Sequence, residues 1–245
     1  MRVHLFSDLH LEFGPLELPS AVRSGALAEL VLLAGDIHTG RRGIRWAART
    51  FAQPVAMILG NHESYGDSLH AVIAAERKHA ADASRRRAAP MRMLERETWS
   101  FISADGTPVR VVGATLWTDF ELFGKDAAPA RMTDAQHRMN DFRTIEIADG
   151  PHGESRAVSP ADQLRLHRES IAFIADELAQ AFRRITIVMM HHAPGPGSVP
   201  EDRLADLFTA AYADRLDALI ERTQPNLWVH GHISTSRDYA IGSTR

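Results

Sequence analysis

Short apolar runs of about 4–6 residues constrain what this chain can fold into more than any other feature. Each run is rich in leucine or β-branched residues and is bounded by residues that favour turns, which is typical of strands buried on both faces of a sheet. Five runs are clear and a sixth is weaker; they lie at residues 3–6, 30–34, 55–59, 109–112, 185–190 and, more weakly, 227–229. We therefore expect sheets that are covered on both sides.

Helical patterns lie between several of these runs. Residues 67–87 place apolar side chains on one helical face, and residues 159–184 begin with Ser159 as the N-cap and Pro160 at the first helical position. Alternating strands and helices predict an α/β domain with a largely parallel sheet. Because no internal repeat or obvious linker interrupts the chain, we expect residues 1–245 to form a single domain.

Composition and charge exclude several kinds of site and partner. With 44% apolar and 24% charged residues the chain is globular, and without cysteine it has no disulfide, thiolate zinc site or cysteine nucleophile. Its formal charge of −3 gives no general attraction to nucleic acid. No apolar run approaches the ~18 residues of a membrane span, and the first residues lack the apolar core of a signal peptide. We expect a cytoplasmic protein with neither a membrane nor a nucleic-acid partner.

Residues that bind metals well follow five of the six runs. Seven of the 13 histidines lie in or close to these segments, counting His38 two residues after Asp36, next to aspartates and an asparagine. Ligand groups collect at the carboxyl ends of the strands in an open α/β sheet, so we expect these residues to meet at one rim. The segments are Asp8-Leu-His10, Gly-Asp36, Gly-Asn61-His62-Glu63, His191-His192 and His230-Gly-His232.

The chemistry of these donors points to a pair of metal ions. Imidazole, carboxylate and amide oxygen suit Mn, Fe, Zn, Co or Ni. If one carboxylate bridges, the group could hold two ions ~3.5–4 Å apart, an arrangement that clamps a phosphate and deprotonates a water. Each motif alone is weak, because Asp-x-His is more often a capping aspartate beside a surface histidine. Their order, each at a strand end, is what predicts a two-metal site.

The five motifs, in this order, resemble those of the calcineurin-like metallophosphoesterases over nearly the whole chain. Residues 113–119 and 139–143 resemble a bacterial branch of that family. The resemblance implies a four-layer α/β/β/α sandwich with two mixed β-sheets and the metals at the tips of the facing sheets. It also implies a hydrolase that cleaves a phosphodiester or a small phosphomonoester by attack of metal-bound hydroxide.

By the same resemblance, six side chains would hold two divalent ions. Asp36 would bridge the ions, with Asp8 and His10 completing the first site and Asn61, His191 and His232 the second. The histidine doublet leaves the register open, and His191 is preferred over His192 because it directly follows the strand.

The remaining candidates concern the phosphorylated substrate. His62 would lie beside the scissile phosphate as a general acid or electrostatic stabiliser, and it is grouped with Asp36 as catalytic. The candidates for substrate binding are Asn61, His62, Asn140, Arg143 and His192. Arg143 is equally well explained as part of a surface ion pair.

Ser234 departs from the pattern of the family. It stands where the motif Gly-His-x-His has its second histidine, and a hydroxyl is a much poorer ligand than imidazole. The first site would therefore be weakened, with Ser234 in weak or water-mediated contact with the metal. This departure favours one alternative, a metal-poor binding or scaffold relative with reduced catalysis.

Two further features leave alternatives open. Residues 241–245 look like a hairpin turn that enters a further strand, so one or more C-terminal strands could be missing, or a second chain could supply one in a homodimer. The basic residues at 85–87, with Arg92 and Arg96, permit a nuclease. A solvated helix end explains the same cluster, because arginine complements the helix dipole there.

Overall fold

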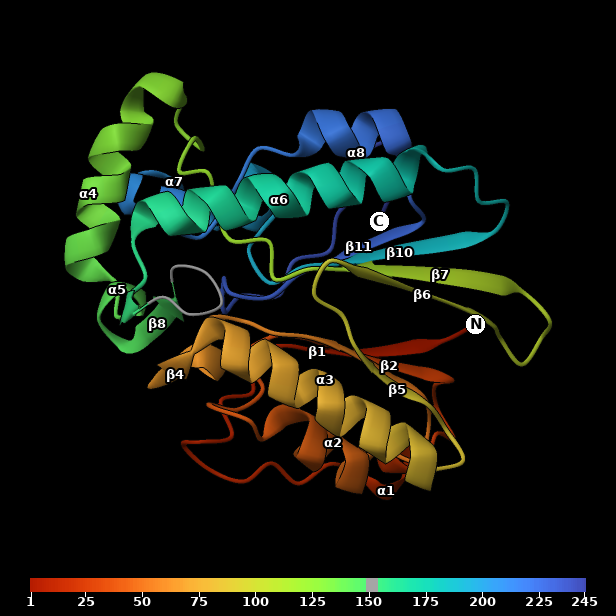
Figure 1. Ribbon diagram of the computed structural model, residues 1–245. Coiled ribbons are helices and arrows are strands. Elements are labelled where there is room, and N and C mark those ends of the chain that lie inside the picture. Colours follow the sequence, from red (N-terminus) through yellow and green to blue (C-terminus); the bar gives the residue numbers. More distant parts are fainter. Residues whose placement is uncertain (149–153) are drawn as a thin grey trace.

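Two four-stranded sheets stack at the centre of the computed structural model, which describes residues 1–148 and 154–245 (Figure 1). The first sheet has the order β1 (Val3–Phe6), β2 (Leu30–Ala34), β3 (Val55–Ile58) and β5 (Met91–Met93), and its pairs are all parallel. The second sheet has the order β11 (Leu227–Val229), β10 (Ile185–Met189), β7 (Pro108–Gly113) and β6 (Glu97–Ile102). Only β6 runs antiparallel to its neighbour, so the second sheet is mixed.

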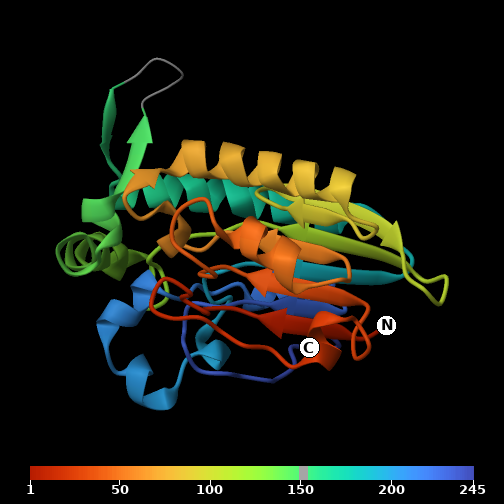
Figure 2. The same ribbon diagram turned by 90° about the horizontal axis from the view of Figure 1, so that it is seen from below.

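Helices cover the outer face of each sheet, which completes the predicted α/β/β/α sandwich (Figures 1 and 2). The first sheet is covered by α1 (Ser20–Arg23), α2 (Gly43–Thr50) and α3 (Leu69–Arg86). The second is covered by α6 (Pro160–Ala179) and α8 (Asp217–Thr223). The α/β class expected from the sequence is confirmed, although the first sheet is parallel throughout rather than mixed.

A smaller group of elements lies at one end of the sandwich (Figure 1). A third sheet there has the order β4 (Asp67–Ser68), β8 (Ile145–Ala148) and β9 (Ser155–Ala157), and the sequence patterns did not predict it. The other helices are α4 (Ala128–Arg138), α5 (Asp141–Thr144) and α7 (Glu201–Leu204). Single 3₁₀ turns are η1 (His62–Ser64), η2 (Lys125–Ala127), η3 (Pro196–Ser198) and η4 (Leu207–Ala211).

Strand β2 shows why the apolar runs are continuous. Leu30, Leu32 and Ala34 pack between the two sheets, whereas Val31 and Leu33 pack toward α2 and α3. All five side chains are fully buried. A strand with both faces covered needs apolar residues at every position, which is the pattern that predicted it.

The boundaries of the two predicted helices differ from the observed ones. Residues 67–68 form a short strand before α3 begins at Leu69. Helix α6 begins as predicted, with Ser159 and Asp162 forming a capping box, but it ends at Ala179 rather than at residue 184. Carbonyl groups at its C-terminal end accept hydrogen bonds from a residue in the second sheet: the guanidinium of Arg110 donates to the carbonyls of Glu177 (2.7 Å) and Gln180 (3.3 Å). That tertiary contact has no signal within the helix sequence itself.

The predicted turn near residue 241 is present. Ile241 and Thr244 form a β-bridge, and the N–H of Trp228 in β11 donates to the carbonyl of Arg245 (2.9 Å). Arg245 therefore lies alongside the outer edge of the second sheet. The further strand and the homodimer stay predictions. Within the described residues, no helix combines the length and the apolar character needed to cross a bilayer.

Candidate metal centre

The loops after β1, β2, β3, β10 and β11 converge at one edge of the two sheets and bring the six predicted ligands together. Asp8, His10 and Asp36 have ligand atoms within 4.8 Å of one another, and so do Asp36, His191 and His232. Asn61 joins the second group, because its Oδ1 lies 3.2 Å from Nε2 of His191. Parallel strands thus deliver their following residues to a common point, as the sequence predicted.

The backbone is strained where it presents these ligands. Asp8, His10, Asp36 and His232 have φ angles of 52°, 44°, 54° and 69°, in the left-handed region that residues other than glycine rarely adopt. Such residues persist only where the surrounding structure holds them, and they cluster at functional sites. Close packing also requires glycine at position 60, because a Cβ there would overlap the carboxylate of Asp36.

The contacts of His191 fit a bound cation. Its Nδ1 lies 2.9 Å from the carbonyl of Ala34, which can only accept, so Nδ1 carries the hydrogen. Nε2 then faces Oδ2 of Asp36 at 3.3 Å and Oδ1 of Asn61 at 3.2 Å, where it can hold either a proton or a cation. Nε2 of His232 is buried without a hydrogen-bond partner among the described residues. Oxygen and nitrogen donors that converge on one point in this way fit a divalent metal.

The electrostatics of the metal-free site agree with this geometry. Burial opposes the charge of Asp36, but His191 and His62 lower the pKa of Asp36 to about 2. Burial likewise opposes a charge on His191, but Asp36 and Asp8 raise the pKa of His191 to about 10. Burial and the neighbouring histidines hold the pKa of His232 well below its usual range, which leaves its imidazole neutral. In the metal-free site the charged Asp36 therefore faces a protonated His191, and a cation that binds there would replace that proton, whereas His232 is already neutral.

The first metal position has fewer side-chain donors. Nε2 of His10 lies 3.9 Å from Oδ2 of Asp36, the same oxygen that faces His191, so Asp36 lies between the two positions. Asp8 is fixed by the backbone N–H of His232, which donates to its carboxylate at 2.9 Å. Ser234 is exposed and lines an open groove with Asp8. Its predicted weak contact with a metal stays a prediction.

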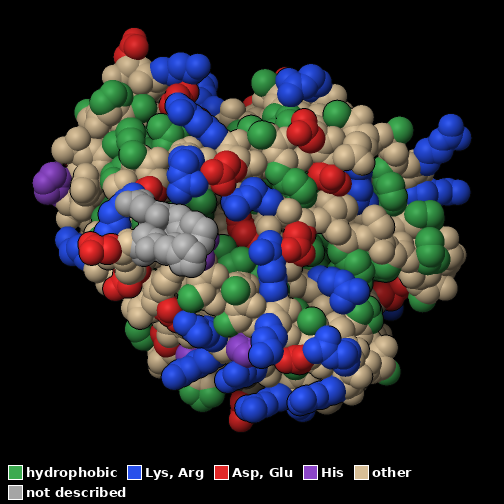
Figure 3. Space-filling view, in the orientation of Figure 1, with side chains coloured by type: hydrophobic (Ala, Val, Ile, Leu, Met, Phe, Trp, Pro, Cys, Tyr) green, Lys and Arg blue, Asp and Glu red, His purple; other side chains and the backbone are tan. Residues whose placement is uncertain are grey.

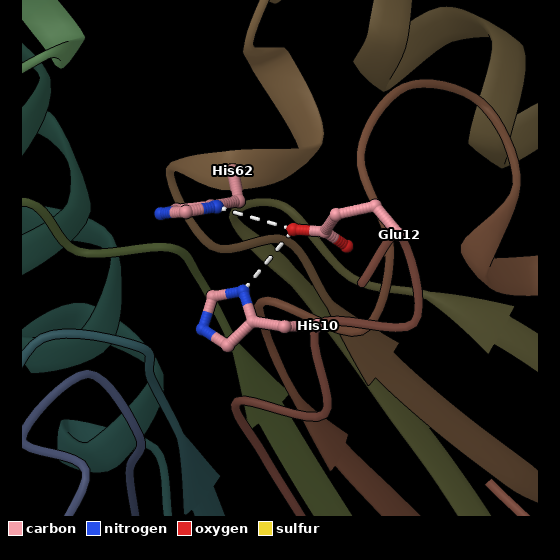
Figure 4. Close-up of side chains that lie close together, drawn as sticks. All are labelled: His10, Glu12 and His62. Carbon is pink, nitrogen blue, oxygen red and sulfur yellow. Dashed lines mark hydrogen bonds and ion pairs between the residues drawn. The ribbon is translucent and has the colours of Figure 1, made fainter. Parts of the chain in front are cut away.

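Glu12 contacts both His10 and His62. The sequence patterns did not identify it as a functional residue. Figure 4 shows Nδ1 of both rings directed at one oxygen of Glu12, with distances of 3.2 Å to His10 and 3.3 Å to His62. The other ring nitrogen of His62 points away from Glu12 (Figure 4). One carboxylate therefore orients a metal ligand and the predicted proton donor together. The spacing Asp-x-His-x-Glu is the signal that could have identified it.

Glu63 holds the loops after β2 and β3 together. Its buried carboxylate accepts the backbone N–H groups of Asp36 (3.0 Å), Ile37 (2.7 Å) and Gly60 (2.7 Å). The glutamate of the Gly-Asn-His-Glu motif thus fixes the backbone on which Asp36 and Asn61 lie.

The predicted substrate residues Asn140 and Arg143 lie at the surface and hydrogen-bond to each other at 2.9 Å. Between them in sequence, Asp141 is fully buried and accepts from Nδ2 of Asn61 (2.9 Å) and the hydroxyl of Tyr65 (2.7 Å). Asp141 therefore turns Oδ1 of Asn61 toward His191. Contact of Asn140 and Arg143 with substrate stays a prediction.

The histidine doublet divides into two roles. His191 faces Asp36 and Asn61, as preferred from the sequence, whereas His192 is fully buried between Trp117 and His232. The predicted contact of His192 with substrate stays a prediction.

The basic cluster is largely used within the fold. Arg87 donates to the carbonyls of Ala48 (2.6 Å) and Gln53 (3.1 Å), Arg85 pairs with Asp82, and Arg96 pairs with Glu95 at 3.1 Å. Lys and Arg side chains gather in the lower part of Figure 3, where α2 and α3 lie, with acidic side chains among them. These helices cover the outer face of the first sheet rather than the edge that carries the metal ligands.

Comparisons with known proteins agree with the geometry. The family model of the calcineurin-like phosphoesterases matches residues 1–235. Phosphopantetheinyl hydrolase (PptH) from Mycobacterium tuberculosis superposes with a TM-score of 0.68 at 17% identity, covering 99% of this chain and 86% of that one. A dimetal phosphatase from Danio rerio gives a TM-score of 0.48 at 15% identity, covering 89% and 70%. No curated protein matches the sequence significantly.

The likeness to PptH shows the fold alone, because the sequence identity is low. The family model covers nearly the whole chain, and all six predicted ligands lie within the matched residues. A phosphoester hydrolase with a divalent two-metal centre is the activity that this match supports. The chain is a member of the calcineurin-like phosphoesterase family.

Proposed function

We propose that this enzyme hydrolyses a phosphodiester or a small phosphomonoester at the centre formed by Asp8, His10, Asp36, Asn61, His191 and His232. The observation that carries the proposal is the position of Asp36, whose Oδ2 faces His10 at 3.9 Å and His191 at 3.3 Å. An oxygen placed between two imidazole nitrogens suits a carboxylate that bridges two cations. When bound, two such cations polarise a phosphate and lower the pKa of the attacking water.

Two side chains at this centre, His62 and Asn61, have separate roles in the proposed reaction. Oδ1 of Asp36 accepts the backbone N–H of His62 at 2.9 Å, which fixes His62 beside the metal ligands. The His62 side chain is 25% exposed, so a substrate can reach it, and its free ring nitrogen would donate a proton to the leaving group. Asn61 would hold the second cation through Oδ1, because Asp141 accepts a hydrogen bond from its amide nitrogen and leaves Oδ1 facing His191.

The donor set suits Mn, Fe, Zn, Co or Ni, and manganese is our choice for a first assay. A small phosphorylated substrate, a cytoplasmic location and a homodimer stay predictions. A nuclease is less favoured than a phosphoesterase with a small substrate, because arginines that suggested nucleic-acid binding make contacts within the fold.

Hydrolysis of bis(p-nitrophenyl) phosphate and p-nitrophenyl phosphate with added Mn²⁺ tests the proposal. Asp36→Asn should reduce kcat/KM at least ~100-fold, because it removes the bridging charge. Asp126→Asn, at an exposed position away from the site, is the matched control and should leave kcat/KM unchanged. Activity that survives both chelation and Asp36→Asn would contradict a two-metal mechanism.

The second candidate function is a metal-poor binding or scaffold protein, and Ser234 is the observation that favours it. Asp8, His10 and the shared Asp36 are the histidine and carboxylate side chains grouped at the first position among the described residues, without the second histidine of the family motif. Ser234→His should then tighten binding of one ion and raise turnover, as measured by calorimetric metal titration and the same assay. Full occupancy of two ions in the native protein, with measurable turnover, excludes this alternative.

A further inference from the structure

Three polar side chains from separate segments meet outside the ligand set described above. Asp119 follows β7, His167 lies in the middle of α6, and Asp214 lies in the loop between η4 and α8. One ligand atom of each lies within 4.8 Å of the others. Nδ1 of His167 is 3.5 Å from Oδ2 of Asp214, and its Nε2 is 3.9 Å from Oδ2 of Asp119.

The hydrogen bonds of the two carboxylates direct one oxygen of each toward His167. Oδ1 of Asp214 accepts the backbone N–H of Asp119 (3.1 Å) and the hydroxyl of Thr118 (3.3 Å). Oδ1 of Asp119 accepts the backbone N–H of Glu121 (2.7 Å). Each Oδ1 is thereby engaged, and each Oδ2 faces the imidazole.

Two of these facing atoms have no hydrogen-bond partner among the described residues, although His167 also contacts the backbone of Trp117 and Asp214 the side chain of Asp119. Oδ2 of Asp214 and Nδ1 of His167 are buried and make no hydrogen bond in the described part of the chain. The residues are 0% and 5% exposed. Across residues 1–148 and 154–245, no arginine or lysine forms an ion pair with Asp119 or Asp214. Buried polar atoms without partners are costly, so a group that satisfies both atoms is expected between them.

The gap between His167 and Asp214 is wide, because Nδ1 of His167 lies 3.5 Å from Oδ2 of Asp214. A metal ion binds one nitrogen of an imidazole, and one ligand atom from each of the three residues lies within 4.8 Å of the others. An N–H···O hydrogen bond is shorter, with a usual distance of about 2.9–3.0 Å. The gap is therefore wider than a shared proton requires and resembles the spacing between ligands of one metal.

We propose that Asp119, His167 and Asp214 form an additional divalent-cation site with a structural role. One imidazole and two carboxylates suit Zn²⁺ or Mn²⁺. The Asp119 side chain is 22% exposed, so water can complete the coordination and the ion has a route of entry. The site is separate from the phosphoesterase centre and does not depend on the proposed substrate.

The position of the site indicates what the ion would stabilise. Leu116, Trp117 and Phe120 have φ angles of 78°, 66° and 62°, so the segment after β7 is strained. The ring of Trp117 packs against His192, with ring centroids 5.5 Å apart, and His192 packs against the metal ligand His232 at 4.4 Å. A cation that ties Asp119 to α6 and to the loop before α8 would hold this strained segment against the catalytic centre.

Metal counting on stripped protein reloaded with Mn²⁺ or Zn²⁺ tests the proposal. Asp214→Asn keeps an oxygen for the Thr118 and Asp119 hydrogen bonds but loses the charge, so it should bind one ion fewer than the native protein. In the Asp36→Asn background, whose catalytic centre is impaired, adding Asp214→Asn should again remove one ion. Asp176→Asn, at an exposed position on α6, is the control and should bind as many ions as the native protein.

His167→Gln, measured in the same way, provides the second variant if Asp214→Asn does not fold. Loss of one ion in either folded variant supports the site. Unchanged metal content in a folded variant overturns it and assigns the cluster to proton sharing between buried groups. Ions bound at the catalytic centre are measured independently by their loss in Asp36→Asn. Unchanged metal content in the Asp214→Asn or His167→Gln variant therefore does not contradict the phosphoesterase proposal.

Discussion

At the scale of single residues, Gly60 shows how closely the ligand loops approach one another. Its backbone N–H donates to Glu63, and a Cβ would overlap the carboxylate of Asp36. Gly60→Ala should lower the free energy of unfolding by about 1–3 kcal/mol and weaken metal binding, because the carboxylate must move. Urea unfolding and metal titration measure the two effects. Gly14→Ala is the control, since nothing lies within 4 Å of a Cβ there, and equal effects of both changes would contradict the explanation.

Glu12 is the residue whose removal tests the coupling between metal binding and catalysis. Glu12→Ala frees the rings of His10 and His62, so metal affinity and kcat should each fall ~10–100-fold. Glu17→Ala, at an exposed position on the same loop, should change neither. Calorimetric metal titration and steady-state kinetics provide the two readouts. A Glu12→Ala protein with native metal affinity and native kcat would show that the rings are held by other contacts.

At the scale of elements, the start of α6 gives a quantitative test of capping. The hydroxyl of Ser159 accepts the N–H of Asp162 at 3.2 Å, and the carboxylate of Asp162 accepts the N–H of Ser159 at 2.9 Å. Ser159→Ala should lower the free energy of unfolding by about 1 kcal/mol. Ser68 stands at the N-cap of α3 but makes no capping hydrogen bond through its side chain, so Ser68→Ala should have a much smaller effect. Urea unfolding of both variants decides this.

The contact between α6 and the loop before α8 predicts a pH dependence in the metal-free protein. Burial and the nearby charge of Asp119 raise the pKa of Asp214 well above its usual range. The folded chain then keeps a proton that the unfolded chain has lost, so stability falls as pH rises between the ordinary pKa of an aspartate and the raised one.

His167 has the opposite effect at lower pH. Burial lowers the pKa of His167, so below pH 6.5 the unfolded chain takes up a proton there first. Because His167 is present in both the native protein and Asp214→Asn, comparing the two with chelator present isolates the effect of Asp214. The native protein should lose stability relative to Asp214→Asn as pH rises above the ordinary pKa of an aspartate, by at most about 1.4 kcal/mol per pH unit. Parallel stability curves for the two proteins would contradict a protonated Asp214.

At the scale of the whole molecule, the metal ligands come from loops that only the folded chain brings together. Cations that bind the folded state alone stabilise it by about 2.7 kcal/mol at a concentration of 100 times Kd. For a chain of this size, saturating Mn²⁺ should raise Tm by roughly 5–10 °C. Thermal unfolding with Mn²⁺ and with chelator measures the shift, and Asp36→Asn should reduce it. An unchanged Tm in the native protein would count against tight binding.

The sequence predicted several strands well because each is defined locally. The apolar run at 30–34 coincides with β2, which is buried on both faces and needs apolar residues throughout, and the runs at 3–6 and 227–229 coincide with the edge strands β1 and β11. The expected burial on both faces is wrong for β1, because Leu5 is 45% exposed at the sheet edge. The third sheet escaped prediction because its strands are short and largely exposed at β9. The end of α6 was misplaced because Arg110, from another layer, supplies its terminal hydrogen bonds.

The sequence by itself determined the types of donor and their order along the chain, because a metal ligand must have a suitable atom and must follow a strand that ends at the common edge. Only the tertiary structure decided which residues hold those donors in place. Glu12 lies 50 residues from His62, and Asp141 lies 80 residues from Asn61. Hydrogen bonds over such separations depend on how the loops pack, and no local pattern encodes that packing.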